Sequence, residues 1–194
     1  MNLANKITMS RIFIMPFFIM GIVYNGIFWK ALAIICFVYA SLSDWLDGFL
    51  ARKKGLESDF GKFMDPLADK IFISSGFISF IAIDKLNIPA WMVIVIISRE
   101  FMITGLRTLA ISKGIVLPAK AAGKFKTTSQ LVTISIILLI LLIYTIETQI
   151  DINILGDKSA SYMMFVPFIL MFIVTLLTVV SGYNYIAENK QLFE

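Results

Sequence analysis

Long apolar stretches separated by short polar connections dominate the chain. Six of them are long enough to cross a bilayer as helices, since about 20 residues at 1.5 Å each span its hydrocarbon core. The connections include Asn25 and Gly26, Asp84 and Lys85, and a longer polar segment at 149–158. The pattern predicts spans near residues 10–25, 29–52, 62–83, 89–112, 126–148 and 160–187.

The segment before the first span has a different pattern. Leu3, Ile7 and Arg11 fall on one stripe of a helix, which is typical of a helix lying in the membrane interface. We therefore expect an all-α, polytopic membrane protein with six transmembrane helices and a short N-terminal interfacial helix. We expect it to form a single domain over residues 1–194. The N-terminal sequence contains no A-x-A-like cleavage site, so we expect it to be retained.

The composition fits lipid as the solvent and restricts the chemistry. Of the 194 residues, 59% are hydrophobic and 15% are charged, whereas a soluble domain is about 45–50% apolar and about 25% charged. A single cysteine, Cys36, excludes an internal disulfide. The chain has no histidine, so a metal site must use oxygen ligands, which favours Mg²⁺ or Mn²⁺ over Zn²⁺.

Lysine and arginine are unevenly distributed between the two sets of connections. With both termini in the cytoplasm, eleven basic residues lie on the cytoplasmic side and three on the other. The positive-inside rule therefore predicts cytoplasmic termini, and short connections without a transit peptide favour a bacterial cytoplasmic membrane. The cytoplasmic set is Lys6, Arg11, Arg52, Lys53, Lys54, Lys62, Lys113, Lys120, Lys124, Lys126 and Lys190, and the opposite set is Lys30, Lys85 and Lys158.

Four aspartates lie in the second and third apolar stretches, where a carboxylate at a span's centre costs roughly 2.5–3.5 kcal/mol. Asp44 and Asp47 are three residues apart and Asp65 and Asp69 are four apart, so each pair shares a helix face. In an antiparallel hairpin, Asp44 would face Asp69 and Asp47 would face Asp65 at matching heights. Two such pairs would frame two divalent cations about 3.5–4 Å apart.

The four aspartates could also form structural ion pairs or the ion site of a transporter. Buried ion pairs alone would need more partners than the spans hold, because only Lys70, Arg99 and Arg107 lie inside them. A divalent-cation transporter would need a pathway to both sides, whereas the four aspartates all lie toward the predicted cytoplasmic side. An enzyme is therefore favoured, with the transporter as the alternative from another class.

The order of these residues resembles the signature of the CDP-alcohol phosphotransferase family. Members of this family transfer a phosphate-containing group from a CDP-linked donor to an alcohol and release CMP, so the resemblance implies a membrane transferase. Every fixed position and the gap of eight residues match that signature. The matching sequence is Asp44-x-x-Asp47-Gly48-x-x-Ala51-Arg52, then eight residues, then Gly61-x-x-x-Asp65-x-x-x-Asp69.

The resemblance also implies a role for each residue of the signature. Asp44, Asp47 and Asp65 would hold two Mg²⁺ or Mn²⁺ ions, with Asp69 at or near the second ion. Asp69 would also act as the general base on the acceptor hydroxyl. The family resemblance further implies a homodimer, and no nucleic-acid partner is expected. The residues that would bind the CDP moiety are Gly48, Ala51 and Gly61 around the cytidine and Arg52 near the nucleotide end.

A basic group in the fourth and fifth stretches could bind a phosphate on the acceptor. Arg107, Lys124 and Lys126 are expected to meet at one anion, with Arg99 deeper, about 12 Å further along its helix. Arginine suits this task because it can bind phosphate through two N–H groups. Positive-inside bias remains the alternative for the lysines and a structural bond the alternative for Arg99. Glu100 points to a different helix face, so no pairing with Arg99 is assumed.

Three further segments resemble bacterial phosphatidylglycerophosphate synthases, a branch of the same family. This resemblance implies transfer of the phosphatidyl group of CDP-diacylglycerol to glycerol 3-phosphate, which gives phosphatidylglycerol phosphate and CMP. Relatives that use inositol phosphate, serine or phosphatidylglycerol share the core motif, so those acceptors remain as alternatives. The segments are Asn5-x-x-Thr8-x-x-Arg11, Ser98-Arg99-Glu100-Phe101 and Gly123-Lys124-x-Lys126-Thr127.

Overall fold

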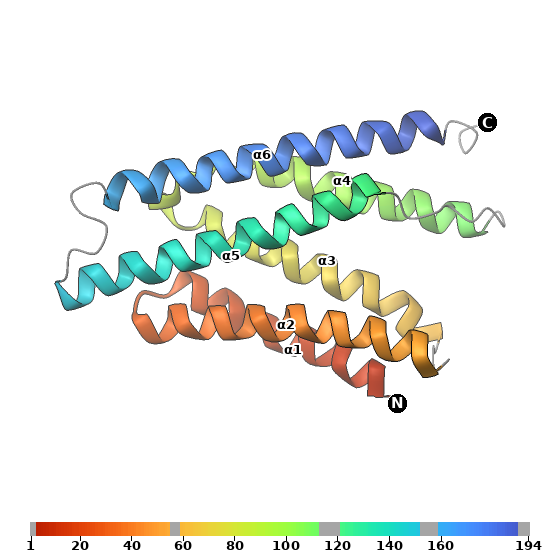
Figure 1. Cartoon of the computed structure of the whole chain (residues 1–194), viewed down its shortest axis with the longest axis horizontal. Helices are drawn as coiled ribbons and strands as arrows, with labels where there is room; N and C mark the ends of the chain where they lie inside the picture. Colours follow the sequence, from red (N-terminus) through yellow and green to blue (C-terminus); the bar gives the residue numbers. More distant parts are fainter. Residues whose placement is uncertain (1–2, 55–58, 113–120, 152–158, 190–194) are drawn as a thin grey trace.

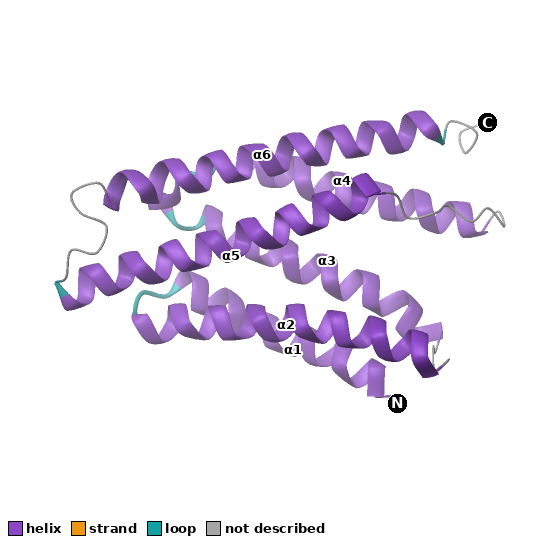
Figure 2. Cartoon of the chain, in the orientation of Figure 1, coloured by secondary structure: helices purple, strands orange, loops and turns teal. Residues whose placement is uncertain are grey.

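All regular structure in the described residues is helical, which confirms the all-α prediction (Figure 2). The computed structural model describes residues 3–54, 59–112, 121–151 and 159–189. Within these ranges some side chains lie outside the description, including those at 45–54, 59–63, 65, 66 and 124. The elements are α1 (Leu3–Val23), α2 (Ile27–Lys54), α3 (Asp59–Ile81), η1 (Asp84–Leu86), α4 (Ala90–Ser112), α5 (Ala121–Ile150) and α6 (Ser159–Glu188).

The helices lie lengthwise in one bundle, with α1 and α2 along one edge and α6 along the opposite edge (Figure 1). Helix α1 packs on both α2 and α3, α5 packs on α2 and α6, and α4 packs on α6. The start of α1 and the end of α6 lie at the same end of the bundle (Figure 1). The ends of α2 and α4 and the starts of α3 and α5 lie at that end too, so the charged residues of several helices can meet there.

Aromatic packing joins the first three helices. The rings of Phe18 in α1 and Phe72 in α3 stack with centroids 4.6 Å apart, and Phe37 of α2 stacks on Phe18 at 6.2 Å. Gly21 lets α1 and α2 approach closely, because a Cβ there would lie 2.7 Å from the backbone nitrogen of Ala33. A buried apolar face of this kind supplies most of the packing that fixes one helix against another.

Three of the described helices are long and apolar enough to cross a membrane, judged by length and composition. The predicted six spans are therefore borne out in part. Helix α1 contributes a shorter apolar segment at Ile7–Val23, while α3 and α4 carry several charged residues along their length. The three spanning segments are Ile27–Asp44, Phe125–Ile150 and Ser161–Glu188.

The expected separate interfacial helix is wrong. Residues Leu3–Val23 form one continuous α-helix, because no glycine or proline interrupts the chain between Leu3 and the apolar run that follows. Arg11 consequently turns into the bundle and is 1% exposed, where an interfacial helix would have left it near the headgroups. Of the basic residues used to orient the chain, Lys113, Lys120, Lys158 and Lys190 lie outside the described residues, as does 152–158 of the predicted loop.

A lysine in the first turn of α2 caps the end of α1. Gly26, in the turn between α1 and α2, has a φ of 129°, a backbone conformation that residues with a side chain rarely adopt. Lys30 is buried, and its ammonium donates to the carbonyl oxygen of Tyr24 at 2.9 Å and to that of Ile22. These carbonyls at the end of α1 have no helical partner of their own. This lysine, predicted on the outer side, is therefore bound within the fold.

Candidate active site

The acidic part of the site lies where α1, α2 and α3 meet. Asp44 in α2 accepts a hydrogen bond from Arg11 in α1, with Nη1 2.9 Å from Oδ1. Arg11 is almost fully buried, whereas Asp44 is 55% exposed. Asp69 in α3 interacts electrostatically with both Asp44 and Arg11. The structure therefore brings together one of the two predicted aspartate pairs and adds a buried arginine to it. We call Arg11, Asp44 and Asp69 the acidic cluster.

The remaining residues of the signature are placed by their backbones alone. Asp47, Gly48, Ala51 and Arg52 continue α2 beyond Asp44, while Gly61 and Asp65 precede Asp69 on α3. Their side chains lie outside the described residues. The roles assigned to them in metal and CDP binding therefore stay predictions.

The donor chemistry of the acidic cluster fits a divalent metal ion. Asp44 and Asp69 offer carboxylate oxygens, the ligands that Mg²⁺ and Mn²⁺ prefer. Their like charges repel each other, although Asp44 comes from α2 and Asp69 from α3, and a cation between them would offset that repulsion. Among the side chains that the structure describes, no group of three or more candidate ligands gathers, so the full ligand set depends on Asp47 and Asp65.

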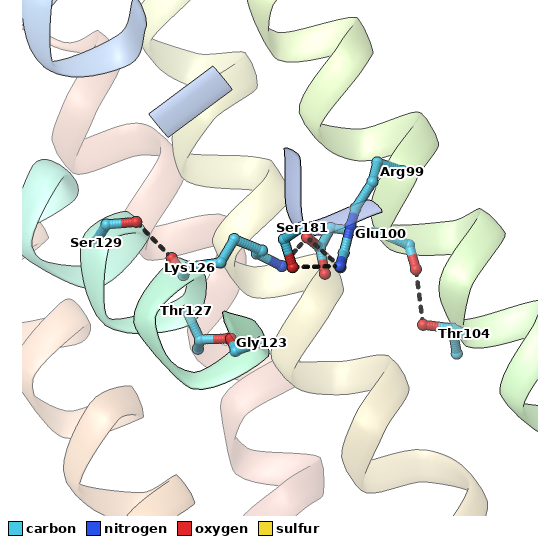
Figure 3. Close-up of polar contacts among 8 residues, drawn as sticks. All are labelled: Arg99, Glu100, Thr104, Gly123, Lys126, Thr127, Ser129 and Ser181. Atoms are coloured by element: carbon cyan, nitrogen blue, oxygen red, sulfur yellow. Dashed lines mark hydrogen bonds and ion pairs between the residues drawn. The ribbon is translucent and has the colours of Figure 1, made fainter. Parts of the chain in front are cut away.

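The basic part of the site joins α4, α5 and α6 (Figure 3). Lys126 in α5 has a side chain only 4% exposed, and its ammonium donates to Glu100 Oε1 in α4. Arg99 Nη1 lies 3.7 Å from the same oxygen, and Arg99 Nη2 donates to Ser181 Oγ in α6 at 2.9 Å. One carboxylate thus lies against two buried cations. We call Arg99, Glu100 and Lys126 the basic cluster.

Two expectations about the basic residues need correction. Glu100 does lie close to Arg99, because both side chains are long enough to converge on Lys126 although their Cα atoms point about 100° apart on the helix. Lys126 was expected to lie near Arg107 and Lys124, with Arg99 deeper along α4. In the structure Lys126 lies close to Arg99, and the two cations repel each other. Arg107 is exposed and interacts electrostatically with Arg99, and the side chain of Lys124 lies outside the described residues.

The two clusters adjoin each other along α3. Lys126 interacts electrostatically with Asp69, although the two residues come from α5 and α3. Lys70, next to Asp69, interacts with Arg99 and Arg107. Charges in a region of low dielectric constant act over longer distances than they do in water. The arrangement can therefore hold a metal-bound diphosphate on one side and a second anion on the other.

Three contributors to the site were not foreseen as such from the sequence: Arg11, Glu100 and Ser181. A usable signal was present for two of them. Thr8 and Arg11 are polar residues three apart, so they share one helix face, and both are buried. Ser181 likewise interrupts an apolar helix. Polar residues inside a membrane helix usually face the bundle, and this rule applied to single residues would have placed both.

A hollow of about 500 Å³ lies on the surface of α4. It is open to the surroundings, carries no charged side chain and includes none of the predicted site residues. Such a lining does not suit a phosphate group. The lining residues are Phe101, Thr104, Gly105, Thr108 and Leu109.

Comparisons with known proteins identify close similarity over almost the whole chain. The sequence pattern of the CDP-alcohol phosphatidyltransferase family matches residues 1–183. A CDP-diacylglycerol–glycerol-3-phosphate 3-phosphatidyltransferase of Bacillus subtilis is 38% identical, over 97% of this chain and 95% of that protein. The protein of the same name from Rickettsia felis is 32% identical over 99% and 97%. A probable phosphatidylglycerophosphate synthase of Mycobacterium tuberculosis is 38% identical over 71% and 66%.

Proposed function

The chain belongs to the CDP-alcohol phosphatidyltransferase family, and we propose that this membrane enzyme transfers the phosphatidyl group of CDP-diacylglycerol to glycerol 3-phosphate. The products are phosphatidylglycerol phosphate and CMP. The observation that carries the proposal is that the acidic and basic clusters adjoin each other where α3 packs on α5, so that Asp69 and Lys126 interact electrostatically. The names of the relatives from Bacillus and Rickettsia, quoted above, support the same pair of substrates.

The acidic cluster would bind the diphosphate end of the donor. Asp44, Asp47, Asp65 and Asp69 would hold two Mg²⁺ or Mn²⁺ ions, and Arg11 keeps Asp44 in place through its hydrogen bond. Bound divalent cations would offset the charge of the diphosphate and of the phosphoryl group in transfer. The CDP moiety would lie along Gly48, Ala51, Gly61 and Arg52, where the small residues let it approach the backbone.

In the transfer step the acceptor hydroxyl oxygen forms a bond to the lipid-bearing phosphorus. The bond from that phosphorus to the bridging diphosphate oxygen breaks, and CMP leaves with the electron pair. Asp69 takes the hydroxyl proton as general base. Its electrostatic interaction with Lys126 supports this role, because a base must lie between the site of the donor and that of the acceptor.

The basic cluster would bind the phosphate of the acceptor, with Arg107 and Lys124 near its entrance. Two cations against one carboxylate leave an excess positive charge. This charge would attract a phosphate monoester, whereas an uncharged alcohol would gain no such attraction. Arg99 and Lys126 keep donors for it, since a guanidinium has five N–H groups and an ammonium three. Glu100 contacts both cations and so reduces their mutual repulsion.

The membrane arrangement that we propose has six spans, with α3 and α4 crossing although they are charged. Arg99 and Glu100 of α4 form ion pairs with each other and with Lys126 inside the bundle, which lowers the cost of placing them there. Both termini and the active site would face the cytoplasm of a bacterium, and the donor would enter sideways from the inner leaflet. A homodimer is part of the proposal on family resemblance.

The proposal is tested by CMP release from the purified protein with CDP-diacylglycerol, Mg²⁺ and a panel of acceptors, each repeated in EDTA. We expect EDTA-sensitive release with glycerol 3-phosphate and none with serine, inositol phosphate or phosphatidylglycerol. Release with one of those instead would keep the chemistry and overturn the acceptor. No release with any acceptor from folded protein would contradict the proposal and favour a cation transporter.

A further inference from the structure

Helix α6 carries a polar stripe on its buried side. Its members are spaced three or four residues apart, so they share one helix face. All are buried, whereas their apolar neighbours Leu176, Val179 and Val180 are exposed on the opposite side. The stripe therefore faces the bundle, where α6 packs on α4 and α5. The members of this α6 stripe are Thr178, Ser181, Gly182 and Tyr185.

Two members of the α6 stripe fix the side chain of Arg99. Ser181 Oγ accepts the hydrogen bond from Arg99 Nη2 at 2.9 Å (Figure 3). Gly182 allows the Arg99 chain to lie against α6, because a Cβ there would stand 3.0 Å from Arg99 Cγ and 3.3 Å from Nε. A methyl group at that position would force the arginine to move, since real Cβ contacts are rarely so short.

Polar groups beside this contact are buried with no hydrogen-bond partner among the described residues. They are Arg99 Nε and the hydroxyl of Tyr185. Tyr185 is only 8% exposed and lies within electrostatic range of Arg99. Buried polar groups in folded proteins are nearly always hydrogen-bonded. Unpaired donors beside a buried cation point to a ligand that brings several acceptor oxygens.

We propose that the α6 stripe forms the third wall of the acceptor-phosphate site. Ser181 and Gly182 are positioning residues, which hold Arg99 with donors available to the phosphate, and the Tyr185 hydroxyl donates to the bound phosphate. The inference rests on the proposed function, because it names what positions Arg99 for glycerol 3-phosphate. It assigns to α6 a part in acceptor recognition that neither the signature motif nor the basic residues of α4 and α5 supply.

The first test compares two Gly→Ala variants that differ in what the new methyl group meets. In Gly182→Ala it meets Arg99, whereas in Gly105→Ala it meets nothing within 4 Å. Both substitutions raise helix propensity equally. From CMP release we expect Gly182→Ala to raise the KM for glycerol 3-phosphate roughly tenfold, the effect of a misplaced charged hydrogen bond. The KM for CDP-diacylglycerol should stay within about twofold, and Gly105→Ala should change neither.

Two single-hydroxyl deletions test the same wall without adding an atom. Ser181→Ala and Tyr185→Phe should each raise the KM for glycerol 3-phosphate by about threefold to tenfold, again with little change for the donor. If the thermal midpoint in detergent shows that Gly182→Ala does not fold, the Ser181→Ala and Tyr185→Phe variants test the role of α6 without it. Equal changes in both KM values, or none in any folded variant, would overturn the role of α6. The wild-type assay separates this outcome from failure of the proposed function, because that failure removes turnover with glycerol 3-phosphate altogether.

Discussion

The acidic cluster on α1 to α3 and the basic cluster on α4 to α6 are built on the same plan with opposite signs. In the first, one buried arginine is bonded to Asp44 and interacts electrostatically with Asp69. In the second, one glutamate lies against a buried lysine and an arginine. Each cluster keeps an excess of one charge, negative for metal ions and positive for phosphate. A membrane protein can thus retain functional charge in its interior by neutralising part of it.

The clusters differ in how far they are open to water. Asp44 is more than half exposed, whereas Lys126 is almost fully buried. In the proposed function, a metal ion would enter the acidic cluster from solvent, while a phosphate would have to lose water before binding to the basic cluster. We expect substitutions in the acidic cluster to affect the chemical step and those in the basic cluster to affect acceptor affinity.

The largest effect should follow from removing the proposed base. Asp69→Asn loses a metal ligand and the proton acceptor at once, and general base catalysis alone contributes about 10²–10⁴-fold. We expect kcat to fall by at least about 10³-fold, with the helical circular dichroism spectrum unchanged. Asp47→Asn should behave in the same way. Substantial activity in either folded variant would contradict the metal and base assignments.

Removing the buried cation from the acidic cluster should be the next largest effect. Arg11→Gln leaves Asp44 and Asp69 without their shared positive charge. We expect a loss of about 1–2 kcal/mol in stability, because Asp44 is half exposed and water can replace part of the hydrogen bond. A lower thermal midpoint and a lower kcat should accompany an unchanged KM for glycerol 3-phosphate. Arg11→Lys, which keeps the charge, is the control, and an equal loss in both variants would rule out a role for charge.

Removing the carboxylate from the basic cluster tests whether Glu100 holds its two cations together, as Arg11 is expected to hold the aspartates. In Glu100→Gln the two cations lose the carboxylate between them and should move apart. We expect the KM for glycerol 3-phosphate to rise about fivefold to tenfold, with kcat nearly unchanged. Glu147→Gln changes the charge of the chain by the same amount far along α5 and serves as control. A lower KM in Glu100→Gln would show that the glutamate competes with the phosphate.

The smallest effect should come from the exposed edge of the basic cluster. Arg107 is exposed at the surface of the bundle, and solvent at the predicted cytoplasmic end of α4 would screen its charge, so its contribution to phosphate binding should be modest. We expect Arg107→Ala to raise the KM for glycerol 3-phosphate about threefold to fivefold and that for CDP-diacylglycerol much less. High salt should reduce the difference between wild type and variant. Equal shifts for the two substrates would remove Arg107 from the acceptor site.

Most of the fold follows from the hydrophobic pattern, because lipid as solvent demands long apolar helices. The predicted boundaries agree closely for the fourth and last helices, whereas the first and fifth helices begin several residues before the predicted spans, where polar residues extend a helix beyond its apolar part. The interaction of Asp44 with Asp69 also follows from spacing on two antiparallel helices. The prediction for Arg11 was wrong. A basic residue near the N-terminus suggested an interfacial helix, because the pattern did not show that residues 3–23 form one continuous helix.

The ion pairs within the basic cluster could not be predicted from the sequence, for a different reason. Helix geometry places the Cα atoms of Arg99 and Glu100 on different faces, yet their long side chains meet at Lys126 from α5. Such a meeting depends on how three helices pack, which spacing along one helix does not determine. The same holds for Ser181, whose partner lies 82 residues away in the chain.

The most direct test of the account follows labelled glycerol 3-phosphate into lipid while CMP is counted in the same reaction. If the acidic cluster activates the donor and the basic cluster holds the acceptor, each CMP released should accompany one labelled phosphate in the lipid fraction. Mass spectrometry should identify that lipid as phosphatidylglycerol phosphate. CMP release with the label remaining in water would show that the two clusters do not serve one transfer reaction, and would contradict the account.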